Sequence, residues 1–235
     1  MLSIRPARIA DLPRIMTVLE AAKGISKISI VLLLCLAGCY SGWTPRERQI
    51  LSASDSLMYV TVLQADSAIL RTPSAEIGAR LLRSGELATL KAKMRHTVMD
   101  PSQDGVGIAA PQVGINRRAI WVQRFDKPGE PFEFYVDVRI DSTGGEILHG
   151  PEGCLSVPPM RGIVPRHGIV HVSYLNPDSG DRASETVEGY TAIIFQHECD
   201  HLGGILYIDR ADSIFVSEAW AAEREVYNYD RPEWW

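Results

Sequence analysis

The chain has 235 residues, of which 46% are hydrophobic, 23% are charged and 8% are aromatic, and its formal net charge is −5. This composition is typical of a globular protein with one hydrophobic core, and it excludes repeat and collagen-like architectures. The acidic balance argues against a nucleic-acid partner, and four cysteines (positions 35, 39, 154 and 199) are too few and too dispersed for a disulfide scaffold.

The first predicted element is an export signal. An apolar stretch runs from Ile28 to Cys39 behind Lys23 and Lys27. It is shorter than the ~20 residues needed to span a bilayer, and its length suits the core of a signal peptide. Its end, Leu-Ala-Gly-Cys at 36–39, resembles the lipobox of bacterial lipoproteins. The resemblance implies lipidation of Cys39 and a protein anchored to a membrane outside the cytoplasm.

Two alternatives to this signal stay open. The stretch can instead be a buried hydrophobic helix that happens to end in Gly-Cys, which would leave the protein in the cytoplasm. The region before the signal is also longer than usual, so Met16 is an alternative start.

Beyond Cys39, the pattern predicts an α+β fold. Residues 44–47 read Thr-Pro-Arg-Glu, a capping box that begins a spacer helix at Pro45. Apolar residues recur every three or four positions over 87–98 and predict a core-facing helix that ends at Asp100-Pro101. Strands are further predicted at 119–123, 132–140 and 169–174, and helices at 191–201 and 213–227.

The strongest chemical signal is an HExxH motif formed by His197, Glu198 and His201. Residues i and i+4 share one face of a helix, so both histidines can bind one metal ion while Glu198 reaches the water that the ion activates. An open catalytic site usually has three protein ligands. Cys154, which follows a glycine, can be the third, although a lone cysteine is often only a buried apolar residue. The motif predicts a metal-dependent hydrolase.

Three segments in order resemble the motifs of the peptide deformylase family: GVGIAAPQ at 105–112, EGCLS at 152–156 and QHECDH at 196–201. The resemblance covers about residues 66–215. It implies an α+β domain whose antiparallel sheets pack around a central helix carrying the HExxH motif. It also implies one divalent metal ion, typically Fe²⁺ and replaceable by Zn²⁺, Ni²⁺ or Co²⁺, and removal of formate from N-formyl-methionyl peptides.

The resemblance also assigns roles to individual residues. Metal ligands would be Cys154, His197 and His201, with Glu198 as the acid/base. The side-chain amide of Gln112 and the backbone N–H of Leu155 would stabilise the oxyanion, and the substrate-binding residues would be Val106, Gly107, Gly153, Ile193 and Ile194. For the two isoleucines, simple core packing is the alternative.

Two departures from the family pattern stand out. Cys199 replaces an apolar residue and should point away from the metal. Residues 136–139 read Val-Asp-Val-Arg where many members have Asn-Pro, which puts the substrate preference in doubt.

The expected organisation has four parts. They are 1–38, an extension plus signal; 39–65, an anchor and spacer helix; 66–215, the catalytic domain; and 216–235, a C-terminal helix and tail.

Two other functions stay open: a related metallo-amidase or peptidase at the membrane surface, and a non-catalytic lipoprotein that retains the fold.

Overall fold

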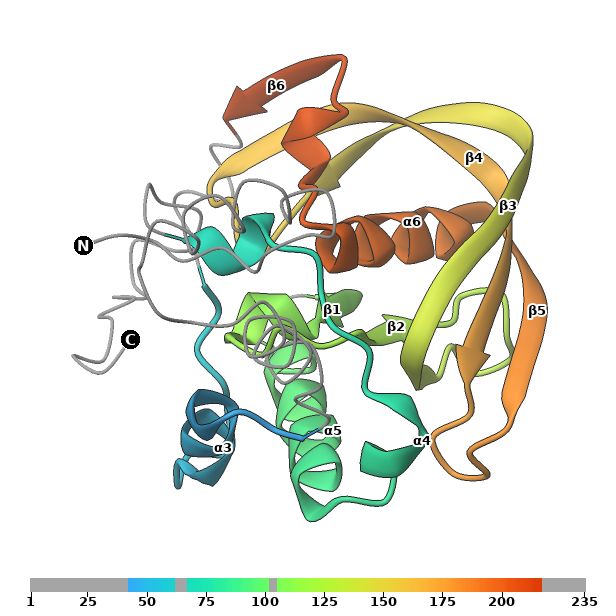
Figure 1. Ribbon diagram of the computed structural model, residues 1–235. Helices are drawn as coiled ribbons and strands as arrows, with labels where there is room; N and C mark the ends of the chain where they lie inside the picture. The colour runs from blue at the N-terminus through green and yellow to red at the C-terminus, as the bar shows by residue number, and fades with distance from the viewer. Residues whose placement is uncertain (1–41, 62–66, 102–104, 217–235) are drawn as a thin grey trace, which may run out of the picture. The chain divides into compact units, whose positions relative to one another are not determined.

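The computed structural model describes residues 42–61, 67–101 and 105–216 (Figure 1). The expected signal with Cys39, the alternative start at Met16 and the expected tail from residue 217 onward lie outside the described residues. The chain divides into two compact units at Thr44, and nearly all described residues belong to the second, Pro45–Trp235. Within the described ranges, no helix has both the length and the apolar character needed to cross a membrane.

Helices and strands of the second unit mix as an α+β fold requires. The helices are α3 (Pro45–Ser52), α4 (Gly78–Leu81), α5 (Gly85–Val98) and α6 (Gly189–Gly203), with short 3-10 helices η2 (Ala68–Arg71), η3 (Ala110–Val113) and η4 (Tyr207–Asp209). The strands are β1 (Gly107–Ala109), β2 (Ala119–Gln123), β3 (Phe132–Gly153), β4 (Met160–Leu175), β5 (Arg182–Glu188) and β6 (Ser213–Val216).

One antiparallel sheet organises this unit. Its strand order is β1-β2-β3-β4-β5, and β6 pairs with β4 beside this path. The long strands β3 and β4 pair from Val136↔Leu175 to Gly153↔Arg161, and in Figure 1 they arch over α6. The predicted fold class, α+β with antiparallel sheets packed around a central helix that carries the HExxH motif, is confirmed, and the strands form one continuous sheet.

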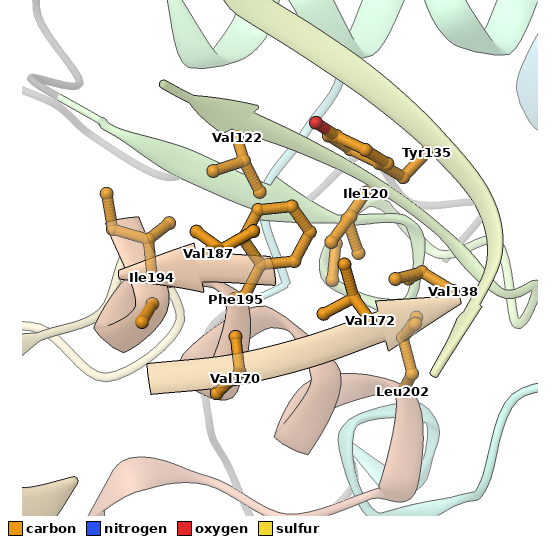
Figure 2. Packing of buried hydrophobic residues seen from close by; sticks show 12 residues of the cluster. Ile120, Val122, Tyr135, Val138, Val170, Val172, Val187, Ile194, Phe195 and Leu202 are labelled. Atoms are coloured by element: carbon orange, nitrogen blue, oxygen red, sulfur yellow. The ribbon is translucent and has the colours of Figure 1, made fainter. Parts of the chain in front are cut away.

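Helix α6 packs against the strands of the sheet through apolar side chains on several sides (Figure 2). Phe195 of the helix meets Tyr135 of β3 edge to face, with ring centroids 4.9 Å apart. Strand residues surround this pair, and complete burial of each large side chain stabilises the fold by roughly 1.5–3 kcal/mol. They are Ile120 and Val122 from β2, Val138 from β3, Val170 and Val172 from β4, and Val187 from β5.

The predicted core-facing helix is α5. Ser84 caps it by accepting a hydrogen bond from the Leu87 backbone N–H (3.2 Å), and the helix stops two residues before the Asp100-Pro101 pair. Its apolar positions Leu87, Leu90, Met94 and Val98 are all buried, as the periodicity predicts.

The predicted strands are present, but two of them are longer than expected. β3 continues to Gly153 and β4 begins at Met160, because the two strands pair across irregular register shifts. Glycines and prolines inside this ribbon favour turns when they are considered locally, but the sheet accommodates them by bulges and by long-range pairing.

The prediction of a helix at 213–227 is wrong for the first residues of that range. Residues Ser213–Val216 form strand β6, which pairs with Met160–Ile163 of β4. The isoleucine, phenylalanine and valine of this segment suit a strand, and the open edge of β4 supplies the backbone partners. The remainder of that predicted helix lies outside the described residues.

The helix expected after Thr44 is α3, and it is packed onto the domain. Glu47 on its first turn forms a bidentate ion pair with Arg117, at 2.8 and 3.0 Å, and both side chains are almost completely buried. Ile50 and Leu51 of the same helix are also buried. The compact unit therefore reaches beyond the boundary at residue 66 that the motifs suggest.

A bulge in β3 marks the position where the chain departs from the family pattern. The register between β3 and β4 shifts between Val136 and Arg139, and Asp137 has a φ of 51°. Its buried carboxylate accepts hydrogen bonds from the backbone N–H groups of Ile77 (2.7 Å) and Gly78 (2.8 Å), at the start of α4. Asp137 is thus a structural residue that joins α4 to the sheet.

Replacing Asp137 with alanine should lower the free energy of unfolding by at least about 2 kcal/mol, since two buried N–H groups lose their acceptor. Alanine also tolerates a positive φ poorly. Urea denaturation measures the change. The matched control is Asp141→Ala on the exposed part of β3, where one hydrogen bond from Ser173 is lost and we expect a change within about 0.5 kcal/mol. Equal effects at both positions would contradict this account.

Candidate metal centre

Helix α6 places the two predicted histidines on one face. The rings of His197 and His201, four residues apart, have centroids 5.0 Å apart. The helix ends at Gly203 and is capped by Gly204, whose φ of 75° suits glycine. A Cβ at Gly204 would lie 2.8 Å from the Arg71 backbone. The HExxH spacing therefore produces the expected pair of neighbouring imidazoles.

Cys154, directly after the end of β3, completes a cluster with these histidines. One ligand atom from each of the three residues lies within 4.8 Å of the others, and the Cys154 Sγ is 3.2 Å from the His201 Nε2. The backbone N–H of Ser156 also donates to the sulfur, at 3.4 Å. A thiolate and two imidazoles form a donor set suited to a divalent transition metal.

Glu152 orients His197 from the second layer of the site. Its carboxylate lies 2.8 Å from the His197 Nδ1 and forms a bidentate ion pair with Arg166, at 2.7 and 3.1 Å. Burial raises the pKa of Glu152, but the hydrogen bonds from His197 and Arg166 outweigh it and lower the pKa to about 2. The resulting anion fixes the Nδ1 proton of His197 toward Glu152, so that Nε2 can face a metal ion.

Arg166 extends this contact to the next turn of α6. Its guanidinium donates to Asp200 at 2.6 Å, and Asp200 also pairs with the more exposed Arg210. Sequence reasoning gave no role to Glu152, Arg166 or Asp200, although all three lie in the segments that carry the family resemblance. The available signal was a charged residue two positions before Cys154 and another one position before His201.

Glu198 lies beside the cluster as a buried carboxylate. It is 3% exposed, and its Oε2 has no hydrogen-bond partner among the described residues. Burial raises the pKa of Glu198 to about 7. Such a group is able to exchange a proton near neutral pH, and its orphaned oxygen is consistent with a ligand that belongs in this space.

Gly107 on β1 makes room for that carboxylate. A Cβ at this position would lie 2.5 Å from the Glu198 Oε1 and 2.9 Å from a methyl carbon of Ile194. Both distances are shorter than real side chains tolerate. The second glycine of the GVG segment is therefore required by close packing against α6, not by a turn.

Gln112 points its amide group into the same site. Its Oε1 accepts from the Ala109 backbone N–H at 2.8 Å, which directs Nε2 toward Ser156 (3.2 Å) and the Cys154 sulfur (3.5 Å). The side chain is buried. Its orientation is fixed by these partners, so an N–H donor is held ready at the cluster.

A cavity of about 250 Å³ opens onto these groups. The predicted substrate-binding residues all line it: Val106, Gly107, Gly153, Ile193 and Ile194. So do the catalytic candidates Gln112, Leu155 and Glu198 and the ligand candidates Cys154 and His197, whereas His201 is buried behind them. Ile194 also belongs to the apolar core, so it both borders the cavity and packs in the core, and its role in substrate binding stays a prediction.

The cavity wall includes three further residues: the sequence carried no clear signal for Met160 and Arg161, whereas it suggested Tyr190 as an addition to the rim. Met160 and Arg161 follow the second motif, and the half-exposed Tyr190 packs against Phe125 with the rings tilted by 51° and their centroids 5.2 Å apart. The β3–β4 turn and the start of α6 bring these residues to the rim. Only the long-range strand pairing could have placed Met160 and Arg161 there.

Cys199 takes no part in the cluster. It packs against the apolar core around Phe195, and burial raises the pKa of its thiol to about 12. Cys154 and Cys199 are both free thiols.

Comparison with known proteins gives consistent results. The family model of polypeptide deformylases matches residues 59–215. The peptide deformylase of Leptospira biflexa is 33% identical over 159 residues, which cover 65% of this chain and 87% of that protein. The actinonin-bound class I type b peptide deformylase of Acinetobacter baumannii is 37% identical with a TM-score of 0.59, over 66% of this chain and 99% of that one. A Met-Ala-Ser-bound structure of the A. baumannii enzyme has 37% identity and a TM-score of 0.57, over 65% and 99% of the two chains.

The Arg166→Met variant tests the buried charges. Loss of the guanidinium leaves Glu152 and Asp200 with fewer partners in a dry site, and we expect the free energy of unfolding to fall by about 3–5 kcal/mol in urea denaturation. Arg210→Met is a matched control because Arg210 also binds Asp200 but is half exposed. Solvent screens that pair, so its loss should cost at most about 1 kcal/mol. Similar losses in both variants would argue against a special role for Arg166.

Proposed function

The chain belongs to the peptide deformylase family, and we propose that the cavity described above is the site where it removes the formyl group from N-formyl-methionyl peptides. The activity is metal-dependent hydrolysis of a linear amide. One observation carries the assignment of the site: Cys154, His197 and His201 have ligand atoms within 4.8 Å of one another, and this cluster borders a cavity that also holds a carboxylate oxygen without a partner among the described residues. A different metallo-amidase or a non-catalytic lipoprotein is not favoured, because the relatives are deformylases.

Members of this family use a divalent metal, and the ligands proposed here are Cys154, His197 and His201. A thiolate with two imidazoles suits Fe²⁺ and also Zn²⁺, Ni²⁺ or Co²⁺, and we propose Fe²⁺ as the native ion. When bound, a divalent ion lowers the pKa of water to near 7 and polarises the carbonyl under attack. Burial lowers the pKa of His201 well below its usual value and so keeps its ring neutral, the state that binds metal.

Glu198 is the proposed acid/base. With a pKa of about 7, its carboxylate can accept a proton from the attacking water and then donate it to the leaving amine. Its surroundings allow both steps, since Oε2 has no competing donor among the described residues and Gly107, which lacks a Cβ, lets Oε1 lie close to β1 without a clash.

Gln112 and Leu155 are proposed to stabilise the oxyanion that forms during attack. The Gln112 amide is oriented by Ala109, and its Nε2, which donates to Ser156 and the Cys154 sulfur in this structure, would turn one N–H group to the oxyanion; Leu155 lines the cavity beside Cys154. Such fixed donors stabilise developing charge most strongly where water is excluded.

The peptide itself is proposed to lie between the strand ends that border the cavity. Val106 and Gly107 come from the β1 side and Gly153 from the end of β3, so their backbones can pair with an extended chain. Ile193 and Ile194 offer an apolar surface for the methionine side chain.

Substitution of Glu198 by alanine tests this mechanism. Formate release from formyl-Met-Ala-Ser by the Ni²⁺-loaded protein should fall by about 10²–10⁴-fold, the usual contribution of a general acid/base. Metal content should stay unchanged, because Glu198 is not a proposed ligand. Glu146→Ala, an exposed glutamate on β3, should retain full activity. Substantial activity in Glu198→Ala, with metal bound, would rule out this role.

We also propose that Cys39 is acylated and that the enzyme acts at a membrane surface outside the cytoplasm, on formylated N-termini that escaped earlier processing. The support is the Leu-Ala-Gly-Cys sequence at the end of an apolar stretch of signal-peptide length.

Membrane fractionation with acyl labelling tests the anchor. The full chain should be recovered in the membrane fraction with a globomycin-sensitive lipid label, and Cys39→Ala should lose the label. Cys35→Ala is the matched control, because it alters a cysteine of the same apolar stretch outside the lipobox position. A soluble, unlabelled full chain would refute the proposal.

A further inference from the structure

The edge of β4 that faces away from β3 has a gap in its strand pairing. β5 pairs with β4 at residues 169–175 and β6 pairs at 160–163, so neither strand reaches His167. Backbone N–H and C=O groups in a buried sheet need partners. At His167 these partners come from a side chain of α6.

Gln196 fills this gap with its amide group. Its Oε1 accepts from the His167 backbone N–H at 3.1 Å, and its Nε2 donates to the His167 carbonyl at 2.8 Å. This two-way contact is the one that a neighbouring strand would make. A third bond, from Nε2 to the Ala192 carbonyl at 3.0 Å, ties the amide back to its own helix, and Gln196 is only 7% exposed.

The contact also fixes the rotation of α6 about its axis. Gln196 and Asp200 share one helix face, and they bind consecutive residues of β4, His167 and Arg166. The metal-binding histidines each follow one residue later, about 100° further around the helix. Metal ligands tolerate distance errors on the order of 0.2 Å, so a small rotation of the helix would separate the histidines from Cys154.

We infer that Gln196 is a positioning residue for the metal site: by pairing with the open edge of β4 it aligns α6 so that His197 and His201 meet Cys154. This inference rests on the proposed function, which makes these three residues metal ligands. It adds a residue that touches neither the metal nor the cavity but decides where the ligands point.

The test compares Gln196→Glu and Gln196→Met with the unaltered chain. Glutamate keeps the size but places a negative oxygen against two carbonyls, and methionine removes both hydrogen-bonding groups. The probe is Co²⁺: its dissociation constant is measured by competition with a chelator, and its visible absorption reports the ligand geometry. We expect both variants to bind Co²⁺ about 10–100-fold more weakly, as is typical when support of a ligand is lost, and to show an altered spectrum.

Thr97→Val is the matched control. Thr97 is equally buried, and its hydroxyl accepts a hydrogen bond from the Met58 backbone N–H at 2.8 Å, but it lies on α5 away from the site. This variant should lower the melting temperature and leave Co²⁺ affinity and spectrum unchanged.

Three outcomes would overturn the inference. Gln196 variants that lose thermal stability but bind Co²⁺ with unchanged affinity and spectrum would show a merely structural role. Failure of both variants to fold would make the amide a requirement of folding instead of alignment. An unaltered chain that binds no Co²⁺ would refute the proposed metal site and, with it, this inference. Failure of the metal site is thereby distinguished from failure of the Gln196 inference alone.

Discussion

The Glu152 carboxylate joins the three elements from which the site is built. It comes from β3, it binds His197 of α6, and it forms a bidentate pair with Arg166 of β4. A carboxyl group buried this deeply would by itself favour its neutral form, since burial penalises charge. Its two partners reverse that preference and lower its pKa to about 2. A permanent anion in a dry pocket then determines which nitrogen of His197 faces the cavity.

The same burial has opposite consequences for its neighbours, and this difference produces the chemistry. Within the described part of the chain, Glu198 has no guanidinium partner of the kind that Arg166 provides for Glu152, so burial raises the pKa of Glu198 to about 7. His201, packed against the core, has its pKa lowered by burial and stays neutral. Two carboxylates of the same site thus differ in protonation: Glu152 is a fixed charge, and Glu198 can exchange protons. Both carboxylates border the cavity, so the difference comes from their partners: Arg166 and His197 bind Glu152, whereas the Glu198 Oε2 has no hydrogen-bond partner among the described residues.

Local sequence patterns were sufficient for much of the fold. Helix α5 follows from its apolar spacing and from the Asp100-Pro101 stop, and β2 occupies the predicted residues 119–123. The prediction failed where non-local pairing decides. Glycines and prolines within β3 and β4 indicate turns when read locally, yet the two strands pair through them, and β6 is a strand because β4 offers it an edge.

For the site, the sequence by itself determined the chemical groups: the HExxH spacing fixes two imidazoles and a carboxylate on one helix because an α-helix repeats every 3.6 residues. Through the family resemblance it also pointed to Cys154, Gln112 and some of the residues that line the cavity. Only the tertiary structure decided what those groups can do. Residues distant in sequence meet in the ion pairs of Arg166 and in the contact of Gln196 with β4. The pKa values of Glu152 and Glu198 likewise differ because of burial and of partners that the fold brings together. Their energies depend on three-dimensional distance and on exclusion of water, and neither quantity is encoded in local spacing.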